Sequence, residues 1–139
     1  MIFKNNMKRP PWDEVWMDVA KTISKRSHHQ DYKVGAIIVT EDNTQVLSIG
    51  YNGNAAGLPN EVDSDIPGCS GLIHAEINAL LKLDYNNPKK KKMYLTLSPC
   101  IDCSKAIINS GIKEVIYKED YRDDSGKNIL SSVISVRKY

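Results

Sequence analysis

The feature that most constrains this chain is a His-Ala-Glu triplet, His74 to Glu76, followed by the run Pro99-Cys100-Ile101-Asp102-Cys103. Imidazole and thiolate groups are ligands that zinc prefers in proteins, and His74, Cys100 and Cys103 supply three of them. Three protein ligands leave one tetrahedral position for water, which is typical of catalytic sites, whereas structural sites use four. The fold must therefore bring two separated segments together around one metal ion.

The carboxylate of Glu76 indicates what such a site could do. Zinc lowers the pKa of a coordinated water towards neutrality, and the deprotonated water could attack an electron-poor ring carbon that carries an amino group. Glu76 is not needed as a ligand and could carry the water's protons to a ring nitrogen and to the departing ammonia. The pattern H-x-E followed by P-C-x-x-C is a known signature of zinc-dependent nucleobase deaminases. We therefore predict a hydrolytic enzyme with one catalytic Zn²⁺ per chain.

A structural zinc knuckle, or a redox-active cysteine pair, is the alternative interpretation of Cys100 and Cys103. Three observations disfavour it. The sequence has no second C-x-x-C pair, a structural site requires four protein ligands, and Glu76 would have no role in it.

The length is that of a single domain. A chain of 139 residues is long enough for one domain with its own core, so we expect residues 1–139 to form one unit. Lys and Arg outnumber Asp and Glu by 19 to 17, a net charge of +2, and part of the excess is the run Lys89–Lys92. We interpret this run as a solvated loop rather than a nucleic-acid patch.

Membrane and nucleic-acid functions find no support in the sequence. No apolar run approaches the length of a membrane span, and residues 1–7 lack the apolar stretch of a signal peptide. Aromatic residues make up only 7%, which gives no stacking platform for single-stranded nucleic acid. Three cysteines, two of them in the motif, indicate reduced thiols and a cytoplasmic location, in the host if the chain is virus-encoded.

Hydrophobic periodicity predicts an alternating α/β chain. Apolar residues recur at helical spacing over 12–27, after Pro10-Pro11, and β-branched runs predict strands at 34–40 and 45–49 joined by a polar turn. Further helices are expected at 73–83, 100–110 and about 126–132, and further strands at 93–97, 113–117 and 133–138. The result is a mixed sheet covered by helices.

These elements give the motif residues defined positions. His74 and Glu76 fall at a helix start, near the positive end of its dipole. Cys100 and Cys103 lie one turn apart on a helix that Pro99 begins and Gly111 ends, so both thiols can face one point. The five glycines and two prolines of residues 50–72 predict a long functional loop.

Segments beyond the zinc motif resemble the deoxycytidylate (dCMP) deaminases of the cytidine-deaminase-like fold, over about residues 20 to 122. They are Ser24–Ser27, Val34–Val39, Gly50–Gly53, His74–Ala79, Tyr94–Cys103, Ser110–Lys113 and Tyr121–Asp123. The zinc motif is shared with other deaminases, including tRNA adenosine deaminases, and the Gly-Tyr-Asn-Gly element is what favours dCMP. The resemblance implies a three-layer α/β/α fold around a five-stranded mixed sheet. It also implies hydrolysis of dCMP to dUMP and ammonia, which supplies thymidylate synthesis.

The resemblance also implies a substrate site. Arg26, Tyr121 and Arg122 correspond to a grip on the 5′-phosphate, for which guanidinium forks and a hydroxyl are suitable donors. Asn52 corresponds to a sugar or phosphate contact, although Asn-Gly is also a turn dipeptide. Backbone groups are expected to meet the cytosine edge at two further positions, Ala75 and Ser98. The alternative for each of these residues is a purely structural or surface role.

Regulation and assembly follow from the resemblance alone. The family is typically hexameric, activated by dCTP and inhibited by dTTP, and a triphosphate effector could carry Mg²⁺. The effector loop would include Gly53, Asn54 and Gly57, but the family's usual Pro is replaced here by Ala55. A second, structural zinc site with the ligands His29, Glu61 and Cys69 is an alternative. We favour a polar helix end and a small buried Cys instead, because these spacings match no established zinc pattern.

Other functions remain as alternatives at this stage. Within the same fold, the chain could deaminate both dCMP and dCTP, or a tRNA adenosine, although a tRNA enzyme should show a more basic surface. Outside enzymes, it could be a zinc-stabilised nucleotide-sensing module. The intact Glu76 argues against that last interpretation.

Overall fold

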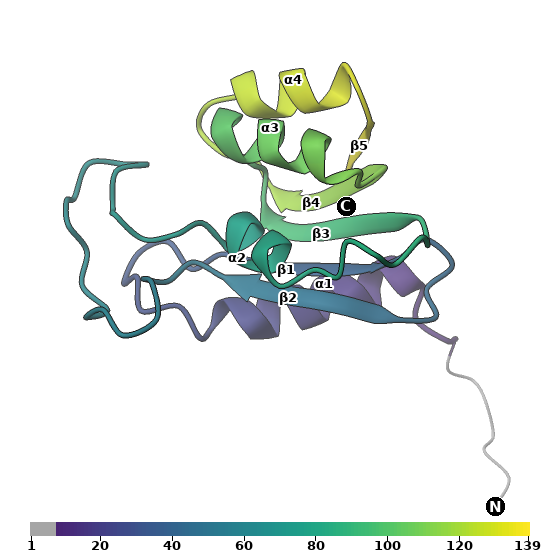
Figure 1. Ribbon diagram of the computed structural model, residues 1–139, viewed down its shortest axis with the longest axis horizontal. Coiled ribbons are helices and arrows are strands. Elements are labelled where there is room, and N and C mark those ends of the chain that lie inside the picture. Colours follow the sequence, from purple (N-terminus) through teal and green to yellow (C-terminus); the bar gives the residue numbers. More distant parts are fainter. Residues whose placement is uncertain (1–7) are drawn as a thin grey trace, which may run out of the picture.

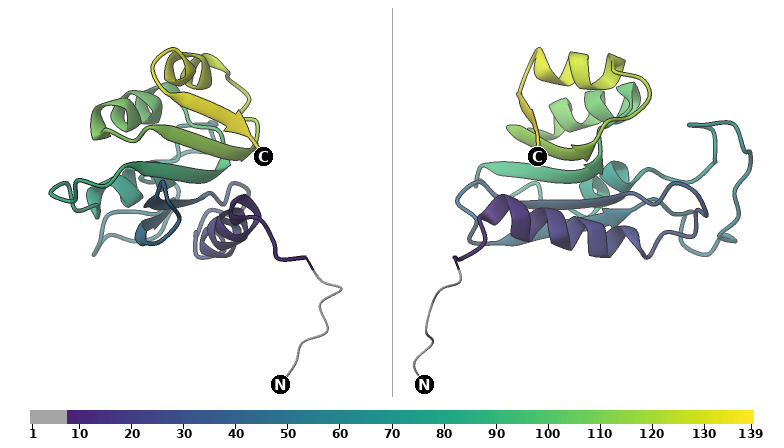
Figure 2. Two further views of the ribbon diagram at one scale, coloured as in Figure 1. Left: turned by 90° about the vertical axis from the view of Figure 1, so that its right-hand side faces the viewer. Right: turned by 180° about the vertical axis from the view of Figure 1, so that it is seen from behind.

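A computed structural model describes residues 8–139, and the predicted polar segment of residues 1–7 lies outside them. The helices and strands follow one another along the chain in the predicted order. They are α1 (Trp12–Ser24), β1 (Gly35–Thr40), β2 (Val46–Tyr51), α2 (Ala75–Leu81), β3 (Lys91–Leu97), α3 (Ile101–Ser110), β4 (Glu114–Glu119), α4 (Ser125–Ser131) and β5 (Ser135–Lys138). Between β2 and α2, the long loop extends beyond one end of the sheet (Figures 1 and 2).

The sheet is five-stranded and mixed, as predicted, with the order β2-β1-β3-β4-β5. Strand β1 is antiparallel to both β2 and β3, whereas β3, β4 and β5 run parallel. A short turn at residues 41–44 suffices for the antiparallel hairpin, but each parallel pair needs a crossover, and α3 and α4 provide them. The cytidine-deaminase-like architecture expected from the sequence is therefore confirmed.

Helices cover both faces of the sheet. Figure 2 shows α1 on one face and α2, α3 and α4 on the other, and all six residues of β1 are buried. Alternate residues of the central strands serve two cores. Ile37, Val39 and Tyr94 pack with α1, and Ile38 and Met93 belong to the core beneath α2 and α3. Along residues 8–139, no helix combines the length and apolarity needed to cross a bilayer.

A polar cluster ties the first helix to the last strand. Arg137 on β5 donates two hydrogen bonds to the Asp13 carboxylate of α1, at 2.6 and 3.0 Å. The Tyr94 hydroxyl on β3 donates a third, at 2.5 Å. The bonds from Arg137 hold the pKa of Asp13 below its ordinary value, so the carboxylate stays charged and α1 is fixed across the sheet.

Two glycines allow helices to approach at the edge where the zinc motif lies. A Cβ atom on Gly50 of β2 would lie 2.3 Å from the Ala75 carbonyl oxygen, at the start of α2. A Cβ atom on Gly126 of α4 would lie 2.4 Å from the Pro99 oxygen and 2.5 Å from the carbonyl carbon of Cys100. Both contacts are backbone contacts that cannot rotate away. The starts of α2 and α3 therefore depend on these glycines.

We predict that Gly126→Ala destabilises the protein by about 1–3 kcal/mol, the usual cost of overpacking. Ala in a helix normally stabilises relative to Gly by about 0.5–1 kcal/mol, so the close approach to Pro99 reverses the expected sign. Denaturant unfolding of the zinc-loaded protein measures the effect. The control is Ser131→Ala, an exposed change on the same helix, and equal stability of the two variants would show that α4 can move away freely.

Candidate active site

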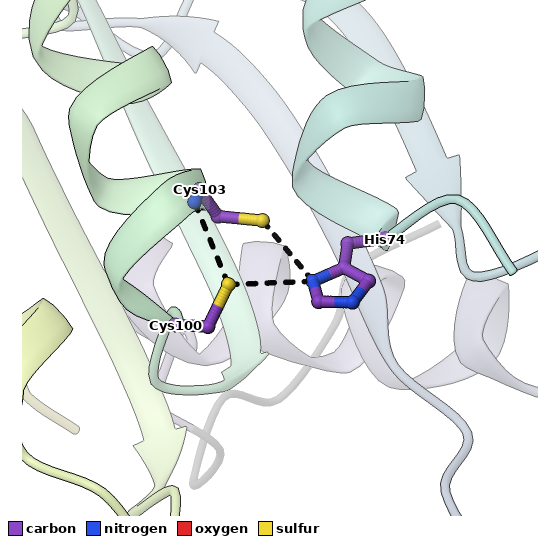
Figure 3. Close-up of side chains that lie close together, drawn as sticks. All are labelled: His74, Cys100 and Cys103. Carbon is purple, nitrogen blue, oxygen red and sulfur yellow. Dashed lines mark hydrogen bonds between the residues drawn. The ribbon is translucent and has the colours of Figure 1, made fainter. Parts of the chain in front are cut away.

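The three predicted zinc ligands meet at the starts of two helices. His74 is the N-cap of α2 and Cys100 the N-cap of α3, while Cys103 lies in the first turn of α3. Nδ1 of His74 lies 3.2 Å from Sγ of Cys103 and 3.5 Å from Sγ of Cys100 (Figure 3). These are the side chains that residues 8–139 gather as a potential metal-binding group, with ligand atoms within 4.8 Å of one another.

The geometry of this group fits zinc. Tetrahedral zinc with bonds of about 2.3 Å to sulfur and about 2.0 Å to nitrogen separates those ligand atoms by about 3.5 Å. The two nitrogen–sulfur distances found here are close to that value without rearrangement. Three ligands of these types leave the fourth position to a non-protein ligand, which is the arrangement of a catalytic site rather than a structural one.

The two thiols differ in how readily they lose a proton. Hydrogen bonding from Cys103, with help from His74, lowers the pKa of Cys100 to about 4. The same bond and burial raise the pKa of Cys103. Together the two thiols therefore retain one proton near neutral pH, and metal binding releases it because zinc takes thiolates.

Glu76 lies next to the ligands without belonging to their group. It occupies the first turn of α2 and is only 4% exposed. Burial raises the pKa of the Glu76 carboxyl, and the neighbouring His74 opposes that effect. A buried carboxyl whose pKa is raised by desolvation holds a proton more readily than an exposed one, which suits a general acid–base group.

The family comparison agrees with this arrangement. The family model of the cytidine and deoxycytidylate deaminase zinc-binding region matches residues 10–119. The chain belongs to this family. The match includes α1, the complete hairpin, all three zinc ligands and Glu76, so the family predicted from the sequence is confirmed.

Individual relatives give the same result at moderate identity. The chain is 38% identical to human deoxycytidylate deaminase over 82% of its own length and 68% of the human protein. It is 35% identical to the deoxycytidylate deaminase of Mycobacterium phage D29, over 82% of this chain and 99% of that protein. The yeast (Saccharomyces cerevisiae) deoxycytidylate deaminase is 32% identical, and the match spans only 46% of its length.

A solved structure supports the fold over nearly the whole chain. The dCMP deaminase of cyanophage S-TIM5, in complex with dCMP and dUMP, is 32% identical, with a TM-score of 0.81. The superposition covers 96% of this chain and 100% of the cyanophage chain. A deaminase–reductase of Thermotoga maritima, with 21% identity and a TM-score of 0.68, shares the fold alone.

Three of the residues expected from the sequence to bind substrate form a connected unit. Oγ of the buried Ser98, just before Pro99, accepts a hydrogen bond of 2.7 Å from the Tyr121 amide. The guanidinium of Arg122 lies over the Tyr121 ring, 4.5 Å from its centroid. Arg122 also donates to the Pro67 carbonyl oxygen at 3.0 Å, so the long loop contacts the predicted phosphate grip.

Asn52, Ala75 and Arg26 are placed differently. The Asn52 side chain is buried and accepts from the Val34 amide at 2.9 Å while donating to the Tyr32 oxygen at 2.7 Å. It therefore holds the segment that follows Arg26. Ala75 is the first residue of α2. The Arg26 side chain is exposed and makes no hydrogen bond or ion pair within the described part of the chain.

The predicted effector loop is tied to the zinc site by backbone bonds. Gly53 pairs with Ile73, the residue before His74, through hydrogen bonds of 2.9 and 3.1 Å. The Asn54 side chain donates to the Pro59 oxygen at 2.7 Å and so links the two ends of the segment from residue 54 to residue 59. Gly57 is exposed, with a φ of 88°.

A second metal site is not assembled here. Within residues 8–139, His29, Glu61 and Cys69 do not form a group of potential ligands. Nδ1 of His29 instead accepts hydrogen bonds from the Asp31 and Tyr32 amides, at 3.1 and 3.0 Å. The structural role that the sequence favoured for His29 is therefore observed, but the prediction of a buried Cys69 is wrong, because Cys69 is exposed.

Sequence reasoning missed the residues that support the site from outside the motif. Asn78 on α2 donates to the Tyr51 oxygen at 2.9 Å and fastens α2 to the end of β2. A polar residue at a helix position facing the sheet was the available signal. Gly126 and Pro67 gave no signal, because Ser-Gly and Pro-Gly pairs are also ordinary turn sequences.

We predict one zinc ion per chain in the purified protein, measured by elemental analysis. Cys103→Ser should lose most of it, because the soft thiolate is replaced and one of only three ligands is gone. Cys69→Ser is the control, since Cys69 is exposed and outside the group. Two zinc ions per chain, or a loss of metal in the control, would contradict the assignment.

Proposed function

We propose that this chain hydrolyses dCMP to dUMP and ammonia. The observation that carries the proposal is the placement of a buried Glu76 beside a His74/Cys100/Cys103 ligand group. The relatives named deoxycytidylate deaminase, from human to phage, support dCMP as the substrate. The match to a deaminase solved with dCMP and dUMP, over nearly the whole length of both chains, supports it further.

The chemistry divides between metal and protein. Zinc held by the three ligands supplies Lewis acidity that lowers the pKa of water towards neutrality. Glu76 accepts a proton from the attacking water and passes it to N3 of the cytosine ring. Oxygen adds to C4, and Glu76 then carries the second water proton to the amino group. The C4–N bond breaks, and ammonia leaves.

The remaining predicted residues are assigned to binding. Arg122 and Tyr121, already stacked on each other, would hold the 5′-phosphate together with Arg26. Asn52 has one further lone pair on Oδ1 and would meet the sugar while it holds the residue 32–34 segment. Backbone groups at Ala75 and Ser98 would face the cytosine edge, since these residues flank the zinc ligands in sequence and lie at the same helix starts.

We predict that Glu76→Gln lowers ammonia release from dCMP by about 100- to 10,000-fold, the usual contribution of a general acid–base group. Zinc content should not change, because Glu76 is not a ligand. Glu41→Gln, an exposed change in the β1–β2 turn, is the control for loss of a carboxylate. Activity within tenfold of the unchanged protein would remove Glu76 from this role.

The same assay decides the substrate. Ammonia release is compared for dCMP, dCTP and deoxycytidine. We expect dCMP to be preferred, and equal turnover of dCTP would make the enzyme a dual-substrate deaminase. No turnover of dCMP by zinc-loaded protein would overturn the proposed function.

Assembly and regulation form a separate proposal. Trp12 of α1 is stacked on Trp16 and remains 47% exposed, and Leu81 of α2 is 70% exposed. Such apolar surface suits contact with further copies of the chain, and we propose a homo-hexamer in the cytoplasm. The loop of Gly53, Asn54 and Gly57 would take dCTP, with Mg²⁺, or dTTP as effectors.

We predict a species larger than a dimer by light scattering at micromolar concentration. With Mg²⁺ present, dCTP should raise and dTTP should lower the initial rate on dCMP. Trp12→Ser should shift the assembly towards smaller species, and Tyr32→Ser is a control of similar exposure at another site. A monomer in both variants and in the unchanged protein, with no effect of either triphosphate, would contradict this proposal.

A further inference from the structure

The tip of the long loop contacts the predicted phosphate grip through one tight turn. The Cys69 amide donates to the Ile66 carbonyl oxygen at 2.9 Å, which closes a β-turn with Pro67 and Gly68 at its centre. Gly68 has a φ of 82°. Pro at the second position and a left-handed Gly at the third are the sequence signature of a type II turn.

This turn type explains why the loop can hold Arg122. The central carbonyl of the turn belongs to Pro67 and is not used by the hydrogen bond that closes the turn. It accepts instead from the Arg122 guanidinium at 3.0 Å. The direction of this carbonyl is set by the central peptide of the turn, and the positive φ of Gly68 belongs to the type II orientation of that peptide.

Gly68 is required for a second reason besides its backbone angle. A Cβ atom at this position would lie 3.2 Å from a terminal guanidinium nitrogen of Arg122 and 3.2 Å from the Tyr121 hydroxyl. Gly68, which has no side chain, thus packs against both Arg122 and Tyr121. Any larger residue must displace one of them or open the turn.

The contacts fix Arg122 on two sides and leave it able to bind an anion. The Tyr121 ring supports one face of the guanidinium, and the Tyr121 amide is itself held by Ser98. One terminal N–H is taken by Pro67. Within the described chain, Arg122 forms no ion pair, and its other N–H groups remain free for the bidentate recognition of phosphate oxygens.

The base of the loop keeps this tip in place. The Asp63 amide donates to the Ser70 oxygen at 2.7 Å, so the two sides of the tip are joined. Closer to the zinc site, Gly53 and Ile73 pair in the same way. Backbone hydrogen bonds therefore hold the tip of the loop at its base.

We propose that the Ile66–Cys69 turn is a positioning element for Arg122, with Gly68 as its specificity-determining residue. It acts through Arg122, by holding the guanidinium where a 5′-monophosphate arrives, and it contributes nothing to the chemistry at the base. This inference rests on the proposed function, because it assumes that Arg122 binds the substrate phosphate.

The experiment compares Gly68→Ala, Arg122→Ala and the double variant on dCMP and on deoxycytidine, which has no phosphate. Arg122→Ala should lower kcat/KM for dCMP by about 10- to 150-fold, as expected for one hydrogen bond between charged groups. Gly68→Ala should lower it by about tenfold, mainly through KM, because the added Cβ would lie 3.2 Å from the guanidinium and from the Tyr121 hydroxyl and must push one of them aside, and misplacing a binding group lowers turnover. Gly68→Ala should leave deoxycytidine turnover within about twofold.

The double variant separates positioning from folding. If Gly68 acts only through Arg122, the double variant should be no worse on dCMP than Arg122→Ala alone. Gly111→Ala is the matched control, because Gly111 has a φ of 86° but nothing within 4 Å of an added Cβ. It should lose stability without changing the ratio of dCMP to deoxycytidine turnover.

Other results would overturn the proposal. These are equal losses on both substrates, multiplied losses in the double variant, or an unchanged preference for dCMP in Gly68→Ala. If Gly68→Ala does not fold, Pro67→Ala makes the same test by loosening the turn. Calorimetry measures the binding of dCMP and deoxycytidine to the zinc-loaded Glu76→Gln protein and so tests the positioning of Arg122 without turnover. The proposed function is rejected by a different result, the absence of dCMP deamination by the unchanged protein.

Discussion

The structure depends on the meeting of two helix starts at one point. His74 caps α2 and Cys100 caps α3, and their ligand atoms lie 3.5 Å apart although the segments are far apart in sequence. A tetrahedral metal tolerates little error in such distances. The sheet, the crossovers and the close helix contacts can all be understood as the means of holding this spacing.

The support comes from backbone contacts rather than large side chains. Gly50 lets the start of α2 lie directly on β2, and Gly126 lets α4 press on the Pro99–Cys100 peptide. Side-chain packing can adjust by changing rotamers, but backbone in contact with backbone cannot, so these contacts define positions more rigidly. On the opposite face, α1 is fixed to β3 and β5 by the Asp13 cluster, away from the reacting groups.

The substrate side of the site follows a different principle. The zinc ligands lie on helix starts, whereas the predicted phosphate grip combines the residues after β4 with the tip of a long loop. Loops that carry binding residues on a rigid scaffold are common, and this one is stiffened by its own turn and by paired backbone bonds. The Asn52 side-chain amide likewise bonds the backbone of residues 32–34, so a residue expected to touch substrate also holds this segment in place.

The sequence by itself determined the local and chemical parts of this protein. Periodicity predicted all nine elements within residues 8–139 in the right order, and ligand chemistry selected His74, Cys100 and Cys103 before any distance was known. Local patterns carry such information because helices, caps and metal preferences depend on residue type and short spacing. Only the tertiary structure decided what depends on contacts between distant segments. It showed that Gly126 must be small and that Pro67 reaches Arg122. Neither contact has a periodic or motif signature, because each depends on where two separate parts of the folded chain meet.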